Sequence, residues 1–165
     1  MKRTAYHPAP RRAMRGACLR SYRERGIAAL EFALVFPLFF VVLYGIVTFS
    51  LIFVAQQNLT LAAEEGARAA LNYQSATSTA NALAARSSAA CTTAAGMVTS
   101  LISSATCVSS SNPCSYDATM DCIIVTLTYN YASKPLVPNL PLTNFVLPAS
   151  LVSSATVQLN PENLL

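Results

Sequence analysis

Charged residues are scarce in this chain of 165 residues, where they make up 11%, whereas 53% of the residues are hydrophobic. That composition is too apolar for an ordinary soluble domain and indicates a membrane segment. The single histidine is His7, and the chain has no Gly-rich phosphate loop and no metal-ligand spacing. Because no base stands beside its many Ser and Thr residues, we expect a protein that is not an enzyme and that needs no cofactor or metal.

The positive charge of the chain is concentrated near its N-terminus. The segment up to Arg25 holds one acidic residue, Glu24, against the basic residues Lys2, Arg3, Arg11, Arg12, Arg15, Arg20, Arg23 and Arg25. A basic segment can bind nucleic acid, but no binding motif accompanies this one. Because it borders a long apolar run, we predict that residues 1–26 form a cytoplasmic leader, and we expect no nucleic acid partner.

An uncharged stretch runs from Phe32 to Ala63, and its densest apolar part, Phe32 to Ala55, has 24 residues. A helix needs about 20 residues to cross ~30 Å of hydrocarbon, so this run predicts a transmembrane helix. A cleaved secretory signal is shorter and ends in a small-residue site, which is missing here. Pro37 leaves the Ala33 carbonyl without its usual partner, so we expect a kink or local unwinding there.

Glu31 lies at the edge of this apolar run, where a carboxylate is costly unless it is paired. It could sit near the interface and extend its carboxylate toward water. Alternatively, the chain is cut between Gly26 and Ile27. Glu31 then becomes the fifth residue, and its carboxylate can meet the new terminal ammonium group of a neighbouring subunit. Such a pair would offset the burial cost and fix the register between parallel helices.

Beyond the membrane segment we predict an α+β arrangement with a long N-terminal transmembrane and stem helix, residues 27–73, and a domain over residues 74–165. The stem helix has a stripe at Leu59, Ala62, Ala63, Gly66, Ala70 and Tyr73, and Glu64 and Arg68 are expected to pair. A second helical segment is predicted over 77–95, with a break at Gly96 and a short helix to 105. Alternating apolar residues predict strands over 121–131 and 149–159, which form a small antiparallel sheet.

The chain has five cysteines, of which Cys18 precedes the apolar run and four follow it. Four cysteines in an oxidising compartment indicate two disulfides, and three connectivities are possible. We favour Cys91–Cys107 with Cys114–Cys122 among these. The first pair requires the helical segment to turn back near Gly96, because a straight helix would hold Cys91 and Cys107 ~24 Å apart.

The segment RGIAALEFALVFPLFFVVLYGIVTF, followed by QQNLTLAAEEGARAA, resembles the TadE-like family of the tight-adherence (Flp, type IVb) pilus systems. The strand, Pro-rich bend and final strand also resemble the rear half of that family. Thr48 departs from the pattern, because the family usually has an acidic residue there. The resemblance rests on Arg25, Gly26, Glu31, Phe32, Pro37, Gly45 and Glu65-Gly66-Ala67-Arg68.

This resemblance implies a pilin-like minor pilin or pseudopilin that a membrane prepilin peptidase cleaves between Gly26 and Ile27. Glu31, Phe32 and Pro37 would act in assembly, and the partners would be other pilins, the inner-membrane assembly platform and the lipid bilayer. The N-terminus would lie in the cytoplasm and the C-terminal domain in the periplasm. Two alternatives are an uncleaved single-pass scaffold of the pilus machinery and a secreted domain behind a signal peptide.

Overall fold

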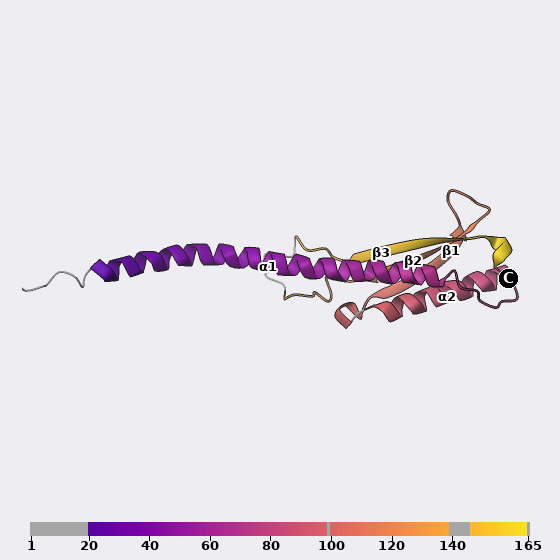
Figure 1. Ribbon diagram of the computed structural model, residues 1–165, viewed down its shortest axis with the longest axis horizontal. Coiled ribbons are helices and arrows are strands. Elements are labelled where there is room, and N and C mark those ends of the chain that lie inside the picture. Colours follow the sequence, from indigo (N-terminus) through magenta and orange to yellow (C-terminus); the bar gives the residue numbers. More distant parts are fainter. Residues whose placement is uncertain (1–19, 99, 139–145, 165) are drawn as a thin grey trace, which may run out of the picture. The chain divides into compact units, whose positions relative to one another are not determined.

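The computed structural model describes residues 20–98, 100–138 and 146–164, with the backbone alone described for residues 20–25. The chain is α+β, as predicted, and its elements are shown in Figure 1. In chain order they are α1 (Arg20–Ala69), α2 (Thr79–Met97), the 3-10 turn η1 (Ser100–Ile102), β1 (Thr106–Pro113), β2 (Asp121–Tyr129), β3 (Leu151–Leu159) and the 3-10 turn η2 (Pro161–Asn163).

The structure divides into two compact units, residues 1–45 and residues 46–165, and the boundary falls inside α1. In the described part of the first unit the chain is helical from Arg20 onward. The helix continues through Pro37, so the local unwinding that we predicted there is absent. Proline removes one intrahelical hydrogen bond. The residues on both sides of Pro37 are apolar, so no neighbouring side chain competes for the remaining backbone hydrogen bonds of the helix.

A three-stranded antiparallel sheet in the order β1-β2-β3 forms the centre of the second unit. In the central strand, Ile123, Val125, Leu127 and Tyr129 are buried on one face, as the alternation predicts. The register places Leu127 between Cys107 of β1 and Ser153 of β3. Residues on the same face therefore line up across all three strands and form one inward surface, which is most apolar along β2.

Helices cover this apolar surface within the second unit. The buried core contains Leu59, Ala62 and Ala63 from α1, together with Ala90 and Ala94 from α2. Small side chains let the two helices approach each other and the sheet closely. α1 is also hydrogen-bonded to β3, since Gln56 Nε2 donates to the Val152 carbonyl oxygen at 2.9 Å.

At Gly66, α1 comes very close to α2 and β2. A Cβ atom added there would lie 2.8 Å from the Ala90 carbonyl oxygen, 2.9 Å from Ala94 Cβ and 3.3 Å from Val125 Cγ1. These distances are too short for ordinary contacts, so only glycine fits at this point of α1. The glycine that the sequence placed on the buried stripe therefore allows α1, α2 and β2 to meet.

Three details of the sequence prediction are wrong. α1 ends at Ala69, so Tyr73 is 67% exposed instead of completing the buried stripe. α2 continues through Gly96 and ends at Met97, so the predicted break lies after the glycine, and the short helix predicted beyond it is the 3-10 turn η1. β1 was missed, and it pairs along its whole length with β2.

The structure forms the two disulfides that the sequence favoured. Cys91 of α2 is bonded to Cys107 of β1 with a Cα–Cα distance of 5.7 Å. Cys114 is bonded to Cys122 with a Cα–Cα distance of 5.0 Å, which closes the loop before β2. The chain does turn back after α2, as the first bond requires, but it turns beyond Met97.

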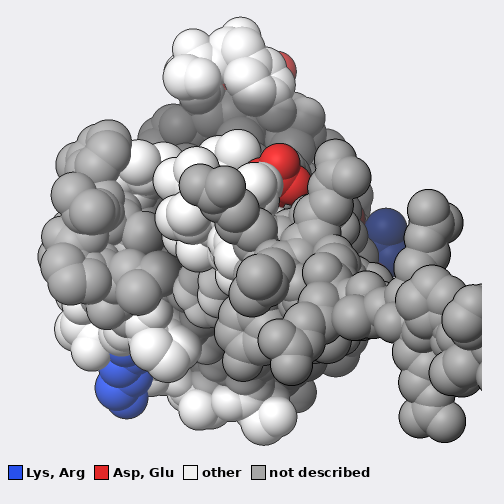
Figure 2. Space-filling view, turned by 90° about the vertical axis from the view of Figure 1, so that its left-hand side faces the viewer, with Lys and Arg blue, Asp and Glu red and all other residues white. Residues whose placement is uncertain are grey.

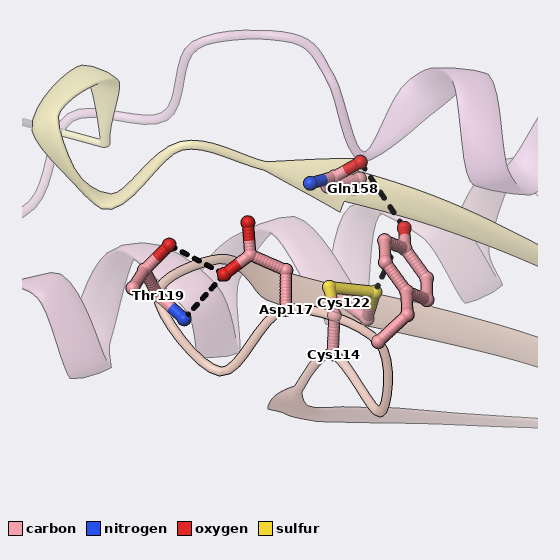
Figure 3. The surroundings of a disulfide bond; sticks show 6 residues. Cys114, Asp117, Thr119, Cys122 and Gln158 are labelled. Atoms are coloured by element: carbon pink, nitrogen blue, oxygen red, sulfur yellow. Dashed lines mark hydrogen bonds between the residues drawn. A yellow bond between two sulfur atoms is a disulfide. The ribbon is translucent and has the colours of Figure 1, made fainter.

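The closed loop between Cys114 and Cys122 is shown in Figure 3. Asp117 Oδ1 accepts hydrogen bonds from Thr119 Oγ1 at 2.6 Å and from Thr119 N at 3.0 Å. Tyr116 donates its hydroxyl hydrogen bond to Gln158 Oε1 of β3 at 3.1 Å. The loop is therefore held by a covalent bond at its base and by side-chain hydrogen bonds at its tip.

Candidate functional site

An exposed apolar helix surface dominates the first unit. Every leucine, isoleucine, valine and phenylalanine side chain from Ile27 to Leu43 is between 46% and 77% exposed. A helix that is apolar on all sides is suited to a lipid or protein environment and not to water. Within the described residues, one helix segment, Gly26–Ala69, is long and apolar enough to cross a membrane, with a mean hydropathy of 2.6 in its best window.

Three phenylalanines form a continuous stripe on this surface. The Phe32 and Phe36 ring centroids are 5.4 Å apart, and the Phe36 and Phe40 centroids are 6.4 Å apart. The four-residue spacing places these rings on one helix face. Phe32, which the family resemblance marked for assembly, is 66% exposed and so is available to a neighbouring helix or to lipid.

The bond between Gly26 and Ile27 lies in exposed chain. Gly26 is exposed, Ile27 is 58% exposed, and a Cβ atom added at Gly26 would meet nothing within 4 Å. Both residues are helical. A protease that binds extended backbone would therefore have to unwind this part of α1 before cutting, and glycine lowers the cost of that change because it weakens a helix by about 1 kcal/mol relative to alanine.

Glu31 is also exposed, one turn beyond the predicted cleavage point. Among the side chains that the structure describes, the only ion pair joins Arg68 to Glu65, so Glu31 has no charged partner there. It lies next to Phe32 at the start of the phenylalanine stripe. The geometry places the carboxylate on the apolar surface, where a cation from another chain could reach it.

Pro37 and Thr48 differ in their surroundings. Pro37 is exposed within the apolar surface of the first unit. Thr48, in the second unit, is 2% exposed, and its Oγ1 has no hydrogen-bond partner in the described part of the chain. Thr48, where the sequence analysis expects a departure from the family pattern, is therefore a buried residue of the second unit.

The charged residues of the stem are solvent-facing. Arg68 Nη1 lies 3.0 Å from Glu65 Oε1, whereas the sequence analysis expected Glu64 as the partner. An exposed pair of this kind contributes at most about 1 kcal/mol. In Figure 2 the blue and red atoms of the described charged residues appear as separate spots.

Arg86 is a buried residue that the sequence analysis did not single out. It is 4% exposed and lies on the buried side of α2 with Ala82, Ala90 and Ala94. The four-residue repeat of these positions was the available signal.

The fold and the surface together define a class of protein with an exposed apolar helix that continues into a small, disulfide-bonded α+β unit. Such a chain is suited to anchoring in a membrane. A family model described as TadE-like protein matches residues 26–68. The resemblance to the TadE-like family is thereby confirmed for the segment from Gly26 to Arg68, which reaches almost to the end of α1. Comparisons with curated proteins and with solved structures found no match.

Proposed function

We propose that this chain is a pseudopilin or minor pilin that takes part in assembling a tight-adherence (Flp, type IVb) pilus. The observation that carries the proposal is the TadE-like match, which begins at Gly26 and covers the exposed apolar helix. TadE-like proteins are pilin-type structural proteins. The role is therefore structural, and no chemistry is assigned to this chain.

In this proposal a prepilin peptidase cuts between Gly26 and Ile27 and removes the basic leader. The new ammonium group at Ile27 then meets Glu31 of a neighbouring subunit. The exposure of both residues and the lack of a described partner for Glu31 support this pairing. Opposite charges attract strongly in a low-dielectric setting, so the pair would set the axial register of adjacent helices.

The proposed location is the inner membrane, with the N-terminus in the cytoplasm and the second unit in the periplasm. Two features support this orientation. The basic residues precede the apolar helix, as is usual for a cytoplasmic flank. The two disulfides lie beyond the helix, and disulfides persist in the oxidising bacterial periplasm. The other proposed partners are pilins, pseudopilins and the assembly platform.

The test is the substitution Glu31→Ala in cells that assemble the pilus. We expect the variant to insert in the membrane normally, because alanine lowers the cost of burying this turn. Pilus yield in the sheared extracellular fraction should fall severalfold, because the register pair is lost. Glu64→Ala is the matched control, since Glu64 is also an exposed glutamate of α1 but lies outside the apolar run, and it should leave the yield unchanged. Normal piliation with Glu31→Ala would contradict the pairing.

A further inference from the structure

The buried guanidinium of Arg86 lacks a charged partner in the part of the chain that the structure describes. Its Nη2 donates to the Asn163 carbonyl oxygen at 3.3 Å, and its buried Nε atom has no hydrogen-bond partner among the described residues. Glu162 is close in sequence to Asn163 but is exposed and forms no ion pair in this part of the chain. Burying a cation with one neutral acceptor is costly.

A pocket of about 300 Å³ lies beside this guanidinium. Arg86 lines it together with Leu71, Tyr73, Gln158, Asn160 and Asn163. The pocket is open to solvent, since Tyr73 is 67% exposed and Asn160 and Asn163 are exposed. No carboxylate side chain is among the lining residues that the structure describes. The net charge of the described lining is therefore positive.

One amide side chain of the lining adds a hydrogen-bond donor to this charge. Asn160 Oδ1 already accepts from Glu162 N at 3.0 Å, so the Asn160 NH2 group remains to donate. Gln158 lies opposite Cys122 in the sheet and its side chain is bonded to Tyr116, so it contributes its backbone and not its amide group to the pocket. A cation beside a further donor is complementary to an anion.

We propose that this pocket binds a carboxylate carried on a short apolar stem, with Arg86 as its principal ligand. A guanidinium group can bind the planar carboxylate group through two parallel hydrogen bonds, here from its terminal nitrogens, because the Nε atom is buried and out of reach of a ligand in the pocket. Leu71 and Tyr73 give the entrance apolar surface for the stem. The volume is at the lower limit for ligand pockets, so the occupant is a small group. This proposal does not depend on the role in pilus assembly.

The proposed occupant is the carboxylate of a separate molecule. The experiment uses the full-length protein in detergent micelles with 15N-labelled arginine, and it follows the Nε–Hε signals during titration with sodium butyrate. We expect a saturable shift of the Arg86 signal and none with butanol, which has the same stem without the charge. The Arg68 signal is the internal control, because that guanidinium is exposed and paired with Glu65.

Variants identify the signals and the site. Arg68→Gln removes the control signal, and Tyr73→Ala changes an exposed rim residue without affecting the core. Tyr73→Ala should weaken butyrate binding at least threefold while the unfolding temperature stays the same. If Tyr73→Ala binds butyrate as tightly as the wild type, the assignment to this pocket is wrong.

A saturable shift of the Arg86 signal in the wild type supports the proposal. A linear response, or no response, overturns the proposal.

Discussion

At the residue scale, the loop between Cys114 and Cys122 shows how local hydrogen bonds set the acidity of one side chain. Two hydrogen bonds from Thr119, first the hydroxyl and then the backbone N–H, lower the pKa of Asp117 below its ordinary value of 3.8. Hydrogen bonds donated to a carboxylate favour its charged form. The contact is therefore complete at neutral pH and is lost as the pH falls through that lowered pKa.

We predict that Thr119→Val raises the pKa of Asp117 toward 3.8, because the substitution removes the hydroxyl donor and leaves the backbone donor. The measurement is the pH titration of the Asp117 carboxyl 13C signal in wild type and variant. Thr156→Val, an exposed threonine of β3, is the control and should not change the titration. An unchanged pKa in Thr119→Val would show that the hydroxyl does not stabilise the carboxylate.

Residue burial could be predicted where the period of apolar residues is unbroken. Leu59, Ala62 and Ala63 are buried as expected, because they recur at three- and four-residue steps within α1. The predicted burial of Tyr73 was wrong, because α1 ends at Ala69, before the turn that would contain Tyr73. The four-residue repeat of α2 indicated a buried position for Arg86. Its hydrogen bond to the carbonyl of Asn163 could not be predicted, because that residue is distant in sequence.

At the element scale, the sequence predicts elements that carry their own apolar pattern. β2 was found because its buried residues alternate, and β3 was found beside a Pro-rich segment. β1 has no such pattern, because its inward positions include Cys107 and Ser109. It is held by pairing with β2, by the bond to Cys91 and by the Ser109 hydroxyl, which donates to the Ser87 carbonyl oxygen at 2.9 Å. These are long-range contacts that a local pattern does not contain.

The packing of α1 on α2 gives a prediction at this scale. Gly66→Ala should lower the free energy of unfolding by about 1–3 kcal/mol, because the added methyl group overlaps the backbone of α2. Gly96→Ala is the matched control, since a Cβ atom there meets nothing within 4 Å and alanine is the better helix former. Thermal unfolding in detergent, followed by circular dichroism, measures both. Equal effects of the two substitutions would show that the helices are not in close contact at Gly66.

At the scale of the whole molecule, the chain combines an apolar helix surface with a unit that has its own core. The core uses alanine and glycine on the helices and branched side chains on the sheet, and two disulfides reinforce it. A unit with few large core residues gains stability from such bonds, typically about 2–4 kcal/mol each. The apolar helix could be predicted from the uncharged run between Phe32 and Ala63, whereas the proposed cleavage and pairing depend on other molecules.

The most direct test of the proposed role is the N-terminal residue of the protein purified from membranes of cells that carry its prepilin peptidase. Edman sequencing together with intact mass spectrometry identifies that residue. The account predicts a mature chain that starts at Ile27 and lacks residues 1–26. A mature chain that still carries the basic leader would contradict it, because Glu31 would then have no terminal ammonium group to meet.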